Sequence, residues 1–151
     1  MKKLLIALIL TLPFLSCKTQ KKIYTPETYD REIITFGSGG GFTGKIKKYS
    51  ILRNGQVFRN SDSPNGGDAS GEMSSLDEDV VDQLFLNFTN LKLVEIQLDD
   101  PGNMTNFINY QENGNTHRIR WGGKNEEVPK SVKTYYKILN QLVSKNKGII
   151  K

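Results

Sequence analysis

Two stretches of alternating apolar and polar residues predict two β-hairpins. Residues 32–36 (EIITF) and 42–52 favour extended strands, and the second reaches Asn54-Gly55, a frequent hairpin turn, before Val57 and Phe58 begin a third strand. Further along, residues 106–111 and 116–121 alternate on either side of Asn113-Gly114. Both turn residues of each pair tolerate positive φ, so each turn is expected to join antiparallel strands.

Two other segments have the 3.6-residue periodicity of amphipathic helices. Ser75 with Glu78 forms a capping box, and apolar residues recur at helical spacing from there to about residue 87. Pro129 suits the first turn of a last helix, whose apolar stripe runs from Val132 to Val143. Residues 91–98 predict a helix end followed by a short extended piece, and residues 99–102 (DDPG) predict a turn.

The order of these elements predicts an α+β domain. We expect an antiparallel sheet of about five strands, made mainly of the two hairpins, with both helices packed on one face. Residues 61–74 (SDSPNGGDASGEMS) have no apolar period and predict a surface loop.

The first residues are typical of a bacterial lipoprotein signal. Two lysines precede an apolar run over residues 4–15, which is shorter than a membrane span but suits a signal peptide. The run ends at Phe14 and Leu15, and the small residue Ser16 then precedes Cys17. This pattern resembles the lipobox, whose cysteine carries a diacyl or triacyl anchor including palmitate; an ordinary secretory signal and a buried apolar helix are the alternatives.

The predicted organisation is therefore a signal peptide over residues 1–16, a flexible tether over residues 17–31 and one domain over residues 32–147. Lys18, not Asp, follows the cysteine. By resemblance to sorted lipoproteins, this indicates the outer membrane of a Gram-negative cell envelope, with the periplasm as its surroundings.

Charge and composition narrow the function classes. The full chain has 21 Lys and Arg against 16 Asp and Glu, and removal of Lys2 and Lys3 leaves 19 − 16 = +3. That balance does not favour a nucleic-acid partner. One cysteine and one histidine exclude a disulfide framework and an ordinary zinc site, and they leave His117 as the only imidazole base. We expect no cofactor, no metal and no catalytic residue.

Residues 39–45 (GGGFTGK) match the first seven positions of a P-loop and also G-x-G-x-x-G. Ile46 stands where a P-loop needs Ser or Thr, and the following residues alternate as in a strand rather than opening a helix. We therefore expect no nucleotide, and we interpret the glycines as a wide connection between two strands.

Three other features have a structural and a functional interpretation. Five oxygen-bearing residues crowd the long loop (Asp62, Asn65, Asp68, Ser70 and Glu72), which suits a solvated loop or a calcium site. The hairpins carry basic residues that either solvate the sheet or attract anionic lipid or an acidic partner: Lys45, Lys47, Lys48, Arg53, Arg59, Arg118 and Arg120. A hydrolase would need Asp99 and Asp100, or Glu126 and Glu127, to converge on His117, which is more typical of a packed or surface position.

Phe36 to Gly44, followed by a hairpin, a helix, a second hairpin and a helix that starts near a proline, resembles the emfourin family over about residues 33–143. These small bacterial proteins have a GGF-A/T-G signature, matched here by residues 40–44, and include inhibitors of thermolysin-type metallopeptidases. The chain departs from them by its loop at residues 61–74 and its lipoprotein signal.

We expect a non-enzymatic envelope lipoprotein, anchored to the membrane through lipidated Cys17, that binds a protein partner. The resemblance implies protease inhibition, with a peptidase as the partner. The alternative is a structural or assembly lipoprotein that docks through its basic hairpins. The candidate binding residues lie in or beside the glycine-rich connection: Gly39, Gly40, Gly41, Phe42, Thr43, Lys45 and Lys47.

Overall fold

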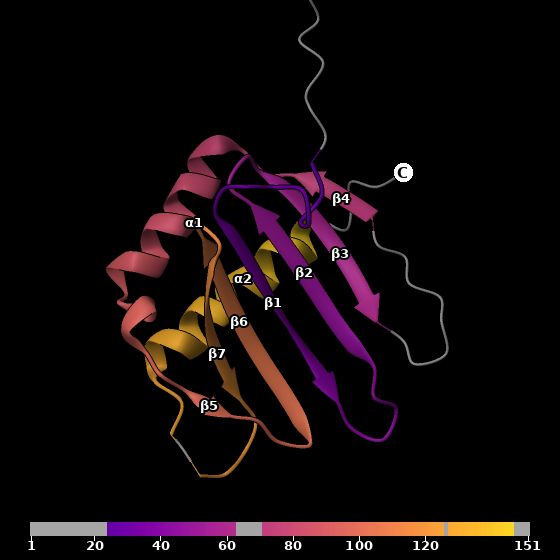
Figure 1. The fold of residues 1–151 in the computed structure, drawn as a ribbon, viewed down its shortest axis with the longest axis vertical. Helices are drawn as coiled ribbons and strands as arrows, with labels where there is room; N and C mark the ends of the chain where they lie inside the picture. Colours follow the sequence, from indigo (N-terminus) through magenta and orange to yellow (C-terminus); the bar gives the residue numbers. More distant parts are fainter. Residues whose placement is uncertain (1–23, 63–70, 126, 147–151) are drawn as a thin grey trace, which may run out of the picture.

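A computed structural model describes residues 24–62, 71–125 and 127–146. The strands are β1 (Ile33–Gly40), β2 (Ile46–Leu52), β3 (Gln56–Asp62), β4 (Gly71–Ser75), β5 (Asp99–Asp100), β6 (Met104–Glu112) and β7 (Asn115–Trp121). The helices are α1 (Glu78–Asn90), the short 3-10 helix η1 (Leu93–Glu95) and α2 (Lys130–Asn146). The chain thus has the α+β fold that the sequence predicts (Figure 1).

The strands form one sheet in the order β4-β3-β2-β1-β6-β7-β5. Every neighbouring pair is antiparallel except β5 and β7, which are parallel, so the sheet is mixed. β1 lies in the middle and joins the β2–β3 hairpin to the β6–β7 hairpin. Its pairings bring Ile34 opposite both Ile51 and Tyr110, and Phe36 opposite both Tyr49 and Ile108.

The prediction of about five strands is wrong, because the sheet has seven. β4 lies in the segment that the sequence predicts to be a surface loop, and β5 lies in the predicted turn at residues 99–102. Both are short edge strands built from Gly, Ser, Asp, Glu and Met, which have no alternating apolar pattern. Pairing with an already formed neighbour makes them extended, so local sequence does not reveal them.

Both predicted hairpins are confirmed, but their turns differ. Asn113 and Gly114 both have positive φ, 50° and 79°, as expected for a two-residue turn. In the first hairpin only Gly55 has positive φ, 90°, and its N–H donates to the carbonyl of Leu52 at 2.9 Å. Asn54 does not adopt a positive φ, so the two hairpin turns have different backbone conformations.

The predicted capping box at Ser75 is also wrong. Ser75 pairs with Gln56 in the sheet, and the next N–H, that of Leu76, donates to the carbonyl of Gly55 at 2.9 Å. Because these backbone groups belong to the ladder, α1 begins later, with Asp77 as an N-cap whose side chain makes no capping hydrogen bond. α1 then continues to Asn90, past the predicted end near residue 87.

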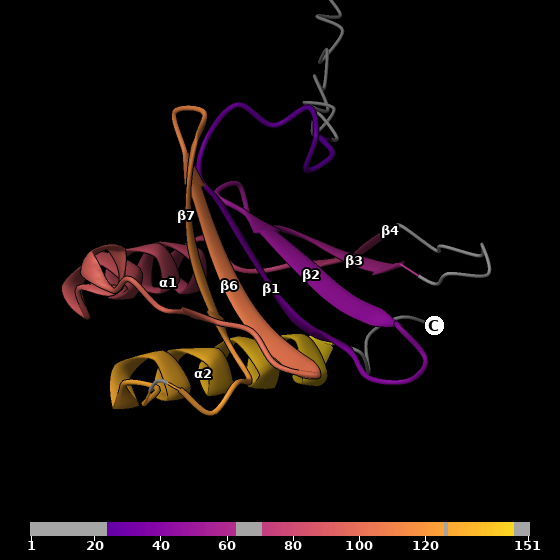
Figure 2. The same ribbon diagram turned by 60° about the horizontal axis from the view of Figure 1, so that its bottom comes forward.

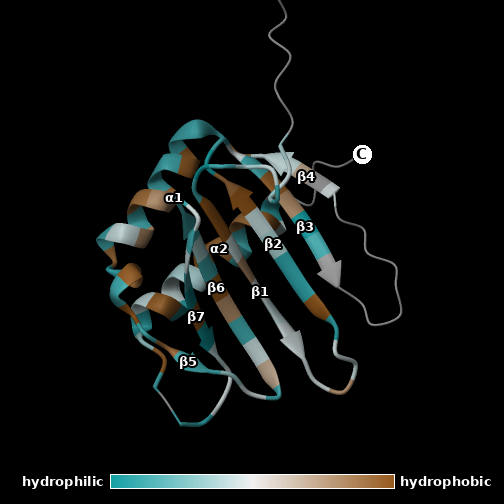
Figure 3. Cartoon of the chain, in the orientation of Figure 1, coloured by the Kyte–Doolittle hydropathy of each residue, from teal (hydrophilic) through white to brown (hydrophobic). Residues whose placement is uncertain are grey.

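The main core lies between the sheet and the two helices, which pack on the same face as predicted (Figure 2). Hydrophobic and hydrophilic bands alternate along α1 and the strands, as one-sided burial requires (Figure 3). Phe88 of α1 is fully buried, stacks on Tyr110 with ring centroids 4.7 Å apart and meets the Tyr135 ring edge-on at 5.6 Å. The Tyr135 hydroxyl donates to the Leu84 carbonyl at 3.0 Å, which joins α2 to α1.

A smaller cluster lies on the opposite face, where residues 24–31 cross the sheet. Tyr29 is buried and packs with Ile33, Leu52 and Phe58, and Tyr24 lies against the same cluster. The described part of the predicted tether therefore packs against the sheet. Cys17, the predicted signal peptide and residues 63–70 of the predicted acidic loop lie outside the described residues.

The aromatic stack around Phe88 predicts an unequal effect of two substitutions in α1. We expect Phe88→Ala to lower the free energy of unfolding by about 3–5 kcal/mol, because it leaves a cavity between Tyr110 and Tyr135. Leu86→Ala, at a side chain that is 55% exposed, should change it by less than about 1 kcal/mol. Urea denaturation of both variants measures the difference, and equal losses would contradict this core assignment.

Candidate functional site

The connection between β1 and β2 is a short turn held by backbone hydrogen bonds. The Gly44 N–H donates to the Gly41 carbonyl at 3.1 Å, and the Gly40 N–H donates to the Lys45 carbonyl at 3.3 Å. A third bond ties the turn to the segment before β6, because the Gly41 N–H donates to the Asn103 carbonyl at 2.7 Å. We call residues 41–45 the Phe42 loop.

Glycine is required at the base of this loop. Gly40 has φ of 113°, a region that side chains disfavour, and a Cβ atom there would clash with the carbonyl oxygen of Asn103. The close approach of the two backbones permits the bond from Gly41 to Asn103. The prediction that the glycine run connects two strands over residues 37–41 is therefore wrong in its bounds, because β1 extends through Gly40 and the connection is the turn at residues 41–45, which the sequence assigns to the second strand from residue 42.

Phe42 is the most exposed large apolar side chain among the described residues, with a relative exposure of 107%. Met104, at the start of β6, is 52% exposed, and its sulfur lies next to Gly41, since a Cβ atom built on that glycine would be 3.1 Å from it. Two exposed apolar side chains therefore lie on or beside one hydrogen-bonded turn. An exposed aromatic residue with an apolar neighbour is typical of a protein-binding surface.

The structure brings most of the predicted site residues together in one hairpin. Gly40, Gly41, Phe42, Thr43 and Lys45 belong to the Phe42 loop or its base. Gly39 lies one residue earlier in β1, paired with Ile46 on one side and Thr105 on the other. Residues 46–52 form a strand and not a helix, so the geometry that a P-loop requires is absent from this segment.

The basic residues of the hairpins do not form one patch. Adjacent strand residues point to opposite faces, so Lys47 lies on the helix side, 5.7 Å from the centre of the Tyr49 ring, and Lys48 lies on the other side. Arg118 and Arg120 share the side of Lys48, as their pairing with Asn109 and Phe107 shows. Arg53 belongs to a separate polar network.

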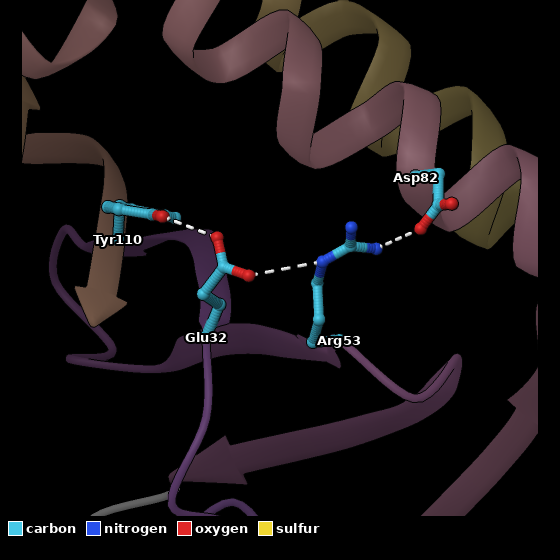
Figure 4. A network of polar contacts seen from close by, with 4 residues as sticks. All are labelled: Glu32, Arg53, Asp82 and Tyr110. Carbon is cyan, nitrogen blue, oxygen red and sulfur yellow. Dashed lines mark hydrogen bonds and ion pairs between the residues drawn. The ribbon is translucent and has the colours of Figure 1, made fainter. Parts of the chain in front are cut away.

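That network, which the sequence does not predict, joins the start of β1 to β6 and α1 (Figure 4). Glu32 accepts a hydrogen bond from the Tyr110 hydroxyl at 2.6 Å. It also forms an ion pair with Arg53, whose Nε lies 3.1 Å from the carboxylate. Arg53 also pairs with Asp82 through its other nitrogen and lies over the Phe85 ring at 5.2 Å. Burial, followed by the hydrogen bond to Glu32, raises the pKa of Tyr110, so this phenol stays a neutral donor.

A cavity of about 480 Å³ opens beside this network. Five carboxylates and two guanidinium groups line it together with Asn113: Asp30, Glu32, Glu78, Asp82, Glu112, Arg31 and Arg53. The hydrogen bonds and ion pairs within it connect elements that are far apart in the sequence. We assign it the structural role of fixing the entry into β1 against α1 and β6.

Of the residues considered for hydrolysis, Asp99 and Asp100 are held by partners other than His117, and Glu126 lies outside the described residues. Asp99 forms a two-point ion pair with Arg120 at 2.6 and 2.7 Å, and the carboxylate of Asp100 accepts hydrogen bonds from Asn125 at 2.9 Å. His117 lies in β7 opposite Tyr110 and faces the Phe88 ring edge-on at 6.4 Å. His117 is thus half-buried beside the core, within the packed or surface position that the sequence favours for it.

No protein-family model matches the chain, and no curated protein matches it. Among the described residues, no group of three or more His, Cys, Asp or Glu side chains is placed to hold a metal ion. No helix in this part of the chain is long and apolar enough to cross a membrane.

The backbone geometry at Gly40 predicts an effect of adding a single methyl group. We expect Gly40→Ala to lower the free energy of unfolding by about 1–3 kcal/mol, because of the positive φ and the clash with Asn103. Gly71→Ala is the matched control, since a Cβ atom there meets nothing within 4 Å and its φ is not positive. Urea denaturation measures the free energy of unfolding of both variants. An unchanged value for Gly40→Ala would contradict the claim that the backbone at residue 40 requires glycine.

Proposed function

We propose that this chain is a lipid-anchored, non-enzymatic protein of the cell envelope that binds a protein partner through the Phe42 loop. The observation that carries the proposal is the full exposure of Phe42 on a turn that three backbone hydrogen bonds hold. Exposure of an aromatic side chain to water is unfavourable in free energy, and transfer of that side chain into an apolar pocket of a partner removes this unfavourable term. We take Phe42 as the anchor of the interface and Met104 as its apolar neighbour.

The free energy gained by burying Phe42 is large enough to contribute substantially to binding. Burial of a phenylalanine side chain contributes about 1.5–3 kcal/mol, and aromatic anchors are frequent among the residues that dominate binding energy. The bonds from Gly41 to Asn103 and from Gly44 to Gly41 restrict the loop before a partner arrives. Less conformational entropy is then lost on binding.

The position of the loop also supports presentation to a partner. β1 has eight residues, so its two ends lie about 23 Å apart at 3.3 Å per residue. Residues 24–31 lie near the Ile33 end, and the Phe42 loop follows the Gly40 end (Figure 1). An anchor at Cys17 therefore attaches to the domain far from the binding loop.

The resemblance of residues 40–44 to the emfourin signature supports a peptidase of the thermolysin type as the partner class. In this proposal the loop enters the cleft of the peptidase and blocks it, and the chain itself needs no catalytic group. We propose the outer membrane of a Gram-negative bacterium as its location, because Lys18 follows the cysteine.

The loop proposal is tested with a chain that begins at residue 17 and carries Cys17→Ser. We expect this chain to capture a partner from solubilised envelope membranes and to inhibit a thermolysin-type peptidase at stoichiometric dose. Phe42→Ser should weaken both effects by about 10- to 100-fold, the equivalent of about 1.5–3 kcal/mol of lost apolar burial. Titration of the captured partner and inhibition assays across a peptidase panel measure the change.

Leu86→Ser is the control, because Leu86 is also exposed but lies on α1. Equal weakening by both variants would show a non-specific apolar effect and would contradict the loop proposal. Capture that depends on Phe42, without inhibition of any peptidase in the panel, would keep the binding loop and reject the peptidase as partner.

The anchor is tested separately, in the cell of origin or a Gram-negative host. We expect the full chain to incorporate labelled palmitate and to fractionate with membranes, because acylation of Cys17 supplies two or more chains. Cys17→Ala should abolish both the label and the membrane association. Labelling that persists in the variant would place the modification elsewhere and refute the lipobox assignment.

A further inference from the structure

Two further connections lie beside the Phe42 loop, at the same end of the sheet. Residues 101–103 lead from β5 into β6, and residues 122–125 follow β7 (Figure 1). Because β6 pairs with β1 on one side and with β7 on the other, the Gly40 end of β1, the start of β6 and the end of β7 are adjacent. The Phe42 loop, residues 101–103 and residues 122–125 therefore form a row along one end of the sheet, which we call the loop row.

Close backbone contacts join the middle connection to both of its neighbours. The Asn103 carbonyl accepts the hydrogen bond from Gly41 at 2.7 Å, which ties residues 101–103 to the Phe42 loop. On the other side, a Cβ atom on Gly102 would clash with the carbonyl oxygen of Gly122, so these two backbones are in contact. The Thr105 hydroxyl accepts a hydrogen bond from the Gly102 N–H at 3.2 Å and donates to the Gly102 carbonyl at 3.0 Å, which fixes the middle connection.

Asp100 holds the third connection in place. This residue is only 7% exposed, and its carboxylate accepts hydrogen bonds from the N–H and the side-chain amide of Asn125, both at 2.9 Å. Its carbonyl accepts a further hydrogen bond from the Gly123 N–H at 2.8 Å. Residues 123 and 125 are thus both bound to Asp100, while Lys124 between them is exposed to solvent.

The apolar surface of the Phe42 loop continues toward this third connection. Met104, which is 52% exposed, has its sulfur next to Gly41. Its carbonyl oxygen lies against Gly122, because a Cβ atom on that glycine would clash with it. Met104 therefore lies between the Phe42 loop and residues 122–125.

The Phe42 loop is too small to make a stable protein interface alone. Such interfaces bury about 800 Å² on each partner and include about 20–30 residues a side. The Phe42 loop has five residues, so a partner that receives Phe42 also has to contact the surface beside it. Hydrogen bonds fix the loop row before a partner arrives, so its contacts lose little conformational entropy on binding.

We infer that the partner bound through Phe42 presents an extended cleft, of the kind that binds a stretch of polypeptide, and that residues 122–125 enter this cleft together with the Phe42 loop. The inference rests on the proposed function, because it takes Phe42 as the anchor. β1 and β7 are two strands apart in the sheet, which separates the outer connections by about 10 Å. Turns at the end of one sheet form a narrow ridge, and a ridge of this length fits a cleft better than a pocket for one aromatic side chain.

The full chain tests this inference in intact cells of the organism of origin. A photoreactive benzoylphenylalanine is introduced in place of Phe42, of Lys124 or of Asn115, one position at a time. We expect irradiation to crosslink positions 42 and 124 to the same envelope protein, identified by mass spectrometry. Asn115 is the matched control, because it is also exposed but lies at the other end of β7, about 20 Å from Trp121, and it should give no crosslink to that protein.

The crosslink from position 124 should also depend on the anchor. We expect Phe42→Ser to lower its yield by about tenfold or more, as loss of apolar burial predicts, and Leu86→Ser to leave it unchanged. A crosslink from position 42 with none from position 124 would overturn the inference and keep the binding loop. The same conclusion would follow if Phe42→Ser left the crosslink from position 124 unchanged. Absence of any crosslink from position 42 would reject the Phe42 loop as a binding site, and the inference with it.

Discussion

The central constraint of this structure is the double pairing of β1. This strand hydrogen-bonds to β2 on one side and β6 on the other, so it is the element that makes two separate hairpins into one sheet. An isolated hairpin is marginally stable in water, and burial of a shared apolar face makes the larger sheet stable. Ile34 and Phe36 supply that face in β1, and both are fully buried under the helices.

The two halves of β1 have different chemistry, and the site follows from that difference. The first half is apolar, and the network of Glu32, Arg53 and Tyr110 holds its start. The second half is rich in glycine, which contributes no core packing but lets Gly40 approach the backbone at Asn103. Consequently, one end of the strand is fixed by side chains and the other by backbone hydrogen bonds, and the second end carries Phe42 in solvent.

The sequence predicts the parts of this fold whose residues repeat a local pattern. The alternation around Asn113-Gly114 and the apolar stripe of α2 locate the second hairpin and the last helix, because burial on one face imposes those periods. β4 and β5 have no such pattern, since pairing with β3 and β7 alone makes them extended. The capping box at Ser75 fails for the same reason, because a sheet ladder competes for that backbone.

The same distinction applies to the site. The backbone requirement at the glycine run was predictable, because glycine density in or beside a strand indicates one wherever it occurs. The exposure of Phe42 was not, because the sequence extends the second strand over residue 42, whereas β2 begins at Ile46. The polar network was not predictable, because Glu32 and Tyr110 are 78 residues apart and nothing local relates them. The faces on which the lysines lie also depend on strand register, because Lys47 and Lys48 are adjacent in sequence but lie on opposite faces of the sheet.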